Sequence, residues 1–168
     1  MLVKEVGGSK ATLYKYFPSK DDLFVGIADQ IVSRAPQDDP LANPDAPIEE
    51  ALDAFGLAIL RGVTGERAVV LFRIALGEYG RFPQLAESLW RTGPQETYRR
   101  FHEFIARREA SGELEVENPQ FAAEQFIAGI VGHIQLKVAM GEAEVPTEDE
   151  MHARVRSARE TFLSRYRR

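Results

Sequence analysis

The side chains with the clearest capacity for chemistry lie in residues 9–24, which read SKATLYKYFPSKDDLF. On a helix of 3.6 residues per turn, Leu13 and Phe17 share one apolar face. The rest of the surface carries lysine, threonine and tyrosine donors, which can reach base edges in a major groove and phosphate oxygens on its walls. The residues that we predict to contact DNA are Ser9, Lys10, Ala11, Thr12, Tyr14, Lys15, Tyr16 and Lys20.

The charge distribution suits a local contact with nucleic acid on an otherwise acidic protein. The formal net charge of the 168 residues is −5, which argues against non-specific nucleic-acid binding. Residues 1–20 nevertheless hold four lysines and one glutamate, a net charge of +3, whereas the remainder holds 17 basic and 25 acidic residues. On charge alone, four ordinary surface lysines remain an alternative.

These donors need a helix that is presented to the groove, and the surrounding sequence predicts one. Residues 2–6 and 9–17 are predicted as two short helices, joined through Gly7 and Gly8, with Ser9 as the N-cap of the second. Pro18 ends that helix, and a third is predicted to about residue 34. The short link is helix-turn-helix geometry, although a plain helical hairpin has the same pattern.

The remaining elements are predicted from apolar spacing and from helix breakers. Residues 35–47 contain four prolines and three aspartates and are predicted as a loop between an N-terminal module, 1–34, and a C-terminal module, 48–168. Apolar residues three and four apart predict helices over residues 48–63, 67–79, 83–111, 119–140 and 147–168. The Gly93-Pro94 pair predicts a kink in the third of these helices. The predicted fold class is therefore all-α.

Several classes of chemistry lack the residues that they need. The chain has no cysteine, so disulfides and thiolate metal sites are excluded, and it shows neither a secretory segment nor an apolar run of about 20 residues. We expect a cytoplasmic protein. The three histidines, His102, His133 and His152, are isolated, and no phosphate-binding loop or nucleophile elbow is present. We expect no enzymatic activity, no metal and no cofactor.

Aromatic and apolar side chains from three of the predicted helices could enclose a cavity for a small, fairly hydrophobic ligand. The candidate pocket residues are Phe72, Trp90, Tyr98, Phe101, Phe104, Phe126, Ile130 and His133. The alternative for each of them is an ordinary place in the core, where aromatic side chains at helical spacing are usually found.

Residues 6–24, VGGSKATLYKYFPSKDDLF, closely resemble the TetR family of transcriptional regulators. In that family the turn and the recognition helix read roughly A-G-V-S-x-x-T-L-Y-x-Y/H-F, followed by x-S/N-K-x-x-L. Segments further on resemble one common subgroup of its C-terminal domains: Arg81-Phe82-Pro83, the run RTGPQETYRRF, and Gly112-Glu113-Leu114 with Asn118-Pro119.

The resemblance implies a ligand-responsive regulator, a repressor rather than an activator, that binds a palindromic double-stranded operator as a homodimer. Two recognition helices would then enter successive major grooves about 34–36 Å apart. It also implies a dimer interface built by the last two helices, within which small residues would allow close approach. The interface residues that we predict are Ala122, Ala128, Gly129, Gly132, Val155, Ala158 and Phe162. The alternative is that both helices pack only within the protomer.

The sequence departs from the family pattern in two places. Gly8 stands where the family usually has a valine in the turn, which makes this turn more flexible. The first helix of the family and most of its second have no counterpart before Met1, so we expect an incomplete DNA-binding head. The alternative function is therefore a helical ligand-binding and dimerisation module that does not bind DNA.

Overall fold

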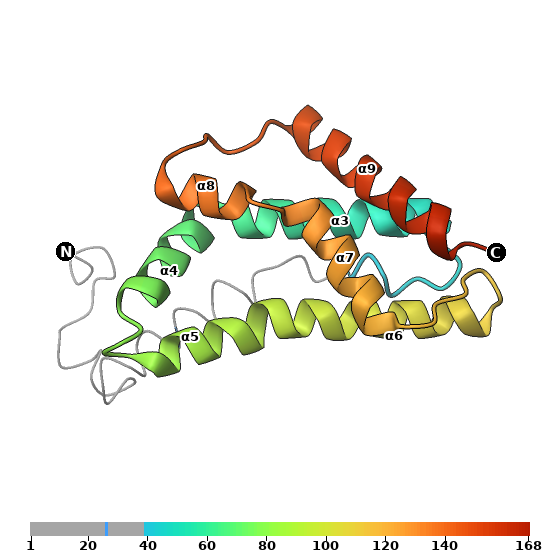
Figure 1. Cartoon of the computed structure of the whole chain (residues 1–168), viewed down its shortest axis with the longest axis horizontal. Coiled ribbons are helices and arrows are strands. Elements are labelled where there is room, and N and C mark those ends of the chain that lie inside the picture. The colour runs from blue at the N-terminus through green and yellow to red at the C-terminus, as the bar shows by residue number, and fades with distance from the viewer. Residues whose placement is uncertain (1–25, 27–38) are drawn as a thin grey trace.

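The computed structural model describes Gly26 and residues 39–168, and every element below lies in the second range. That range is helical, as predicted from the sequence, and Figure 1 shows how the helices lie against one another. The helices are α3 (Ile48–Thr64), α4 (Glu66–Gly77), α5 (Pro83–Trp90), α6 (Glu96–Ala110), α7 (Pro119–Val131), α8 (Ile134–Met140) and α9 (Glu148–Tyr166). Among the described residues, the one β pairing is an isolated bridge between Leu114 and Arg167.

Two helix starts follow directly from capping residues in the sequence. The Asn118 side chain accepts a hydrogen bond from the Phe121 amide at 3.0 Å, and Pro119 takes the first position of α7. Thr147 and Glu150 form a reciprocal capping box at the start of α9, in which the Thr147 amide donates to the Glu150 carboxylate at 2.8 Å. Both starts agree with the sequence prediction.

The helix predicted over residues 119–140 is divided into two. Gly132 ends α7 with φ +47° and ψ −126°, a conformation that glycine tolerates and other residues avoid. His133 then precedes α8. A Cβ atom at position 132 would also lie 3.1 Å from Nη1 of Arg154 on α9, so a side chain at this position would crowd the arginine.

Helices α5 and α6 form one long rod through a π-helical turn, Arg91–Gln95 (Figure 1). Pro94 lies in this turn and has no amide hydrogen to donate, so the ordinary α-helical hydrogen bond cannot form there. The kink that Gly93-Pro94 predicts therefore takes the form of a wider turn rather than an end of the helix.

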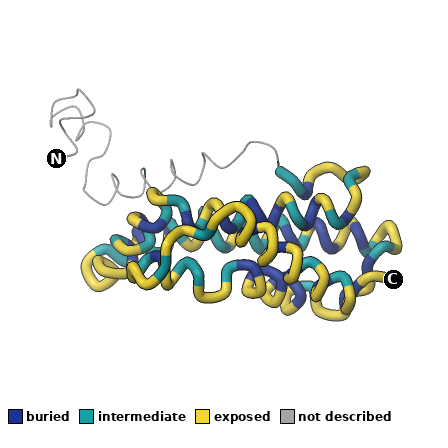
Figure 2. Tube along the Cα trace, turned by 90° about the horizontal axis from the view of Figure 1, so that it is seen from above, coloured by how far each residue is buried: buried dark blue, intermediate teal, exposed yellow. Residues whose placement is uncertain are grey.

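The core lies where α3, α6, α7 and α9 meet, and its centre is aromatic. The Phe101 ring of α6 stacks on Phe126 of α7 with centroids 4.8 Å apart and on Phe55 of α3 at 5.4 Å. Phe162 of α9 meets the Phe101 ring edge-on at 5.6 Å. Figure 2 shows buried residues on the inward sides of the helices and exposed residues on their outer sides.

A smaller cluster, made of Leu71, Ala75 and Leu85, joins α4 to α5 apart from this core. None of the helices in the described ranges is long and apolar enough to cross a membrane.

Candidate functional site

All the residues predicted to contact DNA lie outside the part of the chain that the structure describes. They are Ser9, Lys10, Ala11, Thr12, Tyr14, Lys15, Tyr16 and Lys20. Their contacts with DNA therefore stay a prediction, and so does the helix-turn-helix geometry that would present them.

The structure places the predicted pocket residues in three different environments. Four are completely buried in the main core, where the three rings stack: Phe101, Phe104, Phe126 and Ile130. Two are half-buried, Phe72 on α4 and Tyr98 on α6. Trp90 is 57% exposed at the end of α5, and His133 is exposed at the break between α7 and α8. The structure thus brings the four core residues together, whereas Trp90 and His133 lie at the surface.

Tyr98 is half-buried, and its ring packs against the main core. Burial raises the pKa of its hydroxyl, and the nearby Glu124 carboxylate contributes in the same direction. The hydroxyl is therefore protonated at neutral pH and can act as a hydrogen-bond donor.

The predicted interface residues also divide by exposure. Ala122, Val155, Ala158 and Phe162 are buried within the protomer, in the packing of α7 and α9 on the core; Ala128, Gly129 and Gly132 are exposed along α7. A Cβ atom at Gly129 would be 3.4 Å from that of Ala158, which is an ordinary van der Waals contact.

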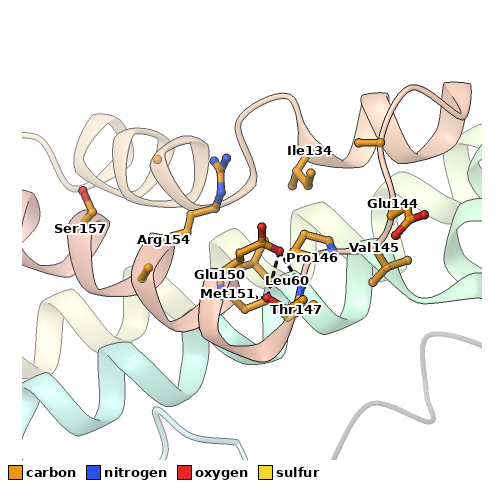
Figure 3. Close-up of a pocket in the computed structure, with 13 residues that line it drawn as sticks. Leu60, Ile134, Glu144, Val145, Pro146, Thr147, Glu150, Met151, Arg154 and Ser157 are labelled. Atoms are coloured by element: carbon orange, nitrogen blue, oxygen red, sulfur yellow. Dashed lines mark hydrogen bonds between the residues drawn. The ribbon is translucent and has the colours of Figure 1, made fainter.

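Beside these exposed residues, a groove of about 760 Å³ separates α7 and α8 from the first half of α9 (Figure 3). Leu60 and Met151 line it as buried residues, whereas Ile134, Val145 and Pro146 line it nearer the surface. The wall also carries charge in Arg154, Glu144 and Glu150, and the Arg154 guanidinium donates a long hydrogen bond to the Ile130 carbonyl, at 3.4 Å.

Sequence reasoning did not find this groove, because it depends on the break at Gly132 and on the path of residues 141–147. Exposed apolar side chains lie on the same elements: Phe121, Leu136, Met140 and Val145. The combination of an open groove and exposed apolar side chains is typical of a surface that another protein covers.

Ion pairs tie α3 to α9 along their length and show that the two helices run antiparallel. Arg61 near the end of α3 binds Glu148 at the start of α9 at 2.6 Å. Arg159 binds Asp53 in the middle. Arg167, just after α9, binds Glu49 in the first turn of α3 and lowers the pKa of that carboxyl.

Among the side chains that the structure describes, two polar atoms are buried without a hydrogen-bond partner: Oδ1 of Asp53 and Nε2 of His102. His133 and His152 are exposed. Within residues 39–168, no group of three or more histidine or carboxylate side chains is arranged to hold a metal ion.

The ionisation of Glu96 is strongly perturbed by its neighbours on α6. Hydrogen bonds from Arg99 and then Arg100 lower the pKa of Glu96 to about 2. The three residues lie on consecutive turns of α6, at spacings of three and four, and stabilise its first turn after the π-helical segment.

Comparison with known families covers both ends of the chain. A model described as the AefR-like transcriptional repressor, C-terminal domain, matches residues 50–168. A second model, described as bacterial regulatory proteins, tetR family, matches residues 1–27. A search of curated proteins finds no match.

Solved structures share the fold over nearly the whole chain. The structure titled Flavonoid-responsive Regulator FrrA is 32% identical, with a TM-score of 0.80 over 99% of this chain and 84% of that one. A TetR transcriptional regulator from Agrobacterium tumefaciens is 25% identical, with a TM-score of 0.83 over 99% and 82%. A TetR family regulator from Pseudomonas syringae pv. tomato str. DC3000 is 24% identical, with a TM-score of 0.75 over 99% of this chain and 83% of that one. At this identity the comparison supports a shared fold only.

Proposed function

This chain belongs to the TetR family of DNA-binding transcriptional regulators, and from that premise we propose that it is a homodimeric repressor released from its operator by a small, mostly apolar effector. The observation that carries the proposal is the pair of family matches, to a DNA-binding segment over residues 1–27 and to an AefR-like repressor domain over residues 50–168. A regulator of bacterial operators works in the cytoplasm, and we propose this location too.

In this proposal Lys10 donates to a guanine edge, while Lys15 and Lys20 bind phosphates on either side of the groove. The net charge of +3 in residues 1–20 supports this role. The acidic remainder of the chain limits binding to other DNA surfaces.

The dimer would form on the surface that carries the groove. Exposed Ala128, Gly129 and Gly132 let a second copy approach α7 closely, and exposed Phe121 and Leu136 offer apolar area to bury. A two-fold dimer uses the same patch on both copies, so each protomer would cover the groove of the other.

The effector would be an aromatic molecule of modest size. One relative, 32% identical, is titled flavonoid-responsive, and flavonoids are aromatic molecules. We assign its contacts to the half-buried rings of Phe72 and Tyr98 and to the exposed ring of Trp90. Such a pocket would combine aromatic walls with a small number of polar groups, among them the Tyr98 hydroxyl.

The test is binding of the full chain to a labelled duplex from the region upstream of its own gene, followed by fluorescence anisotropy at several salt concentrations. Lys15→Ala and Lys20→Ala should each weaken binding to every sequence and reduce the salt slope by about one. Lys137→Ala on α8 is the matched control and should leave both quantities unchanged. Wild-type protein that fails to bind would contradict the DNA-binding proposal and favour a ligand-binding and dimerisation module. Wild-type binding that neither head variant weakens would contradict the assigned DNA-contacting face.

A further inference from the structure

Two adjacent arginines in the last turn of α6 bind the segment that enters the bundle, residues 39–47, here called the linker. Arg107 donates to the Leu41 carbonyl at 2.7 Å, and Arg108 donates to the Ala46 carbonyl at 2.6 Å. These two carbonyls lie near opposite ends of the linker. We call the two arginines and the two carbonyls the linker clasp.

The linker clasp is built into the core and does not rest on solvent-exposed contacts alone. Arg108 is only 6% exposed, and Leu41 is 1% exposed and belongs to the main core. A buried guanidinium needs a full set of partners, because an unpaired buried charge is strongly unfavourable. Arg108 finds them in the Ala46 carbonyl and in the Glu113 carboxylate, 2.8 Å from its other terminal nitrogen.

The linker clasp also touches the aromatic core directly. The Arg108 guanidinium lies over the Phe104 ring, 5.3 Å from its centroid. Phe104 stacks on Phe101, so a movement of these rings would displace the linker through the Arg108 side chain. Tyr98, one of the effector contacts assigned above, packs against the core that contains both rings, and α6 carries the rings one and two turns before the arginines.

The linker has few other polar ties to the bundle in the described part of the chain. Its own hydrogen bonds are local, from the Leu41 amide to the Asp39 carboxylate at 3.0 Å and from the Asp45 amide to the Asn43 side chain at 3.0 Å. The Leu41 side chain anchors the linker by apolar burial, which has no directional preference. The arginine hydrogen bonds therefore supply the orientation.

We propose that Arg107 and Arg108 are positioning residues that make the linker move with α6, and so couple the effector-binding bundle to the DNA-binding residues that precede position 39. This inference rests on the proposed function. Coupling of this kind is reciprocal, so operator binding must change the bundle just as an effector changes operator binding. The reciprocal direction can be tested without knowing the effector.

The experiment is hydrogen–deuterium exchange of the full chain with and without the operator duplex defined by the binding test. In wild-type protein, operator DNA should change exchange in both residues 39–47 and residues 96–110. In Arg107→Met, operator affinity should fall by about three- to thirtyfold, and the change in residues 96–110 should become smaller, because Arg108 still binds the Ala46 carbonyl. Arg107→Lys, which keeps one donor, should restore part of the response.

Arg107 is the primary variant because its side chain is exposed and its replacement leaves the buried pair of Arg108 and Glu113 in place. Arg99→Met is the matched control, since Arg99 is an exposed arginine of the same helix that binds only Glu96 and Glu103. It should keep wild-type operator affinity and the full operator-induced change in exchange, although the loss of its ion pair with Glu96 alters basal exchange in the first turn of α6. Urea unfolding followed by Trp90 fluorescence checks that each variant is folded.

The outcomes separate the two proposals. Operator binding by wild type, with the full exchange response retained in Arg107→Met, would overturn the role of the linker clasp alone. A wild-type response confined to residues 39–47 would overturn it as well. Absence of operator binding by wild type would overturn the proposed function, and the coupling with it.

Discussion

At the level of single residues, Gly56 is closely packed at the point where α3 meets α9. A Cβ atom there would lie 2.7 Å from Cγ1 of Val155 and 3.1 Å from Cδ1 of Ile130. Both neighbours are themselves buried, so neither can move aside without disturbing the core. Glycine is therefore used at this position for space and not for its backbone freedom.

We predict that Gly56→Ala lowers the free energy of unfolding by about 1–2 kcal/mol, because overpacking outweighs the gain in helix propensity. Gly62→Ala on the same helix is the control, since nothing lies within 4 Å of its added Cβ atom. It should raise the free energy of unfolding by about 0.5–1 kcal/mol. Urea titrations with Trp90 fluorescence measure both, and equal effects of the two substitutions would contradict the packing argument.

A second residue-scale prediction concerns pH. The pKa of Glu96 is lowered to about 2 by Arg99 and Arg100, below its ordinary value near 4.5. A carboxyl whose pKa is depressed by folding stabilises the protein above its unfolded pKa, and this stabilisation is lost as pH falls toward the folded pKa. Glu96→Gln should therefore be less stable than wild type at pH 7, and the difference should shrink between about pH 4.5 and pH 2.

Urea unfolding at a series of pH values measures this difference. Glu87→Gln is the matched control, because the Glu87 carboxylate on α5 forms no ion pair with any described residue. Its effect on the unfolding free energy should vary less with pH over the same range. A constant difference between wild type and Glu96→Gln from pH 7 to pH 2 would contradict the assigned cause.

At the level of elements, α3 and α9 are joined by ion pairs of unequal burial. Arg159 and Asp53 are 18% and 35% exposed, and Oδ1 of Asp53 is buried, whereas Arg61 and Glu148 are 53% and 61% exposed. Water and salt screen the second pair far more than the first. The middle pair should therefore hold the two helices together more strongly than the pair at the end.

We predict a coupling free energy of about 1–2 kcal/mol between Asp53 and Arg159 in a double-mutant cycle of alanine substitutions. The same cycle on Arg61 and Glu148 is the control and should give no measurable coupling. Equal coupling in the two cycles would show that burial does not decide the strength of these pairs.

The sequence predicts the elements well where a cap or a breaker acts locally. Asn118 and Thr147 begin α7 and α9, and Pro94 marks the change in the long rod. The break at Gly132 was not predicted, because a glycine inside an apolar run has the same local pattern whether the helix continues or ends. Arg154, which leaves little room for a side chain at position 132, comes from a different helix.

At the level of the whole molecule, residues of the same type on one helix differ in how deeply they are buried. Ala122 is buried in the core and Ala128 is exposed, although both are small residues on α7. The sequence cannot distinguish the two faces of a helix that is apolar nearly all round, since the positions of α3, α6 and α9 decide which face is covered. For the same reason, Arg107 and Arg108 read as ordinary charged residues until the path of the linker is known.

The dimer proposal makes a prediction at this scale. Leu136→Asp on α8 would put a charge into the proposed interface and should shift the protein from dimer to monomer, measured by sedimentation velocity at micromolar concentration. Leu76→Asp on α4 is the control, because Leu76 is 60% exposed, comparable with 49% for Leu136, but belongs to a helix outside the proposed interface. A dimer that survives Leu136→Asp and is lost in Leu76→Asp would place the interface on the other face.

The π-helical turn also changes the direction in which the side chains of α5 point relative to those of α6. Eleven α-helical residues make about three turns, so an unbroken helix would put Trp90 on the same side as the buried Phe101. The π-helical turn contains about one residue more than an α-helical turn. Leu89 instead comes into line and packs against the small α4–α5 cluster, and Trp90 faces outward. Removing a single residue such as Gly93 would rotate α5 by about 100° relative to α6. The extra residue of the π-helical turn therefore decides which side chains of α5 are exposed to solvent.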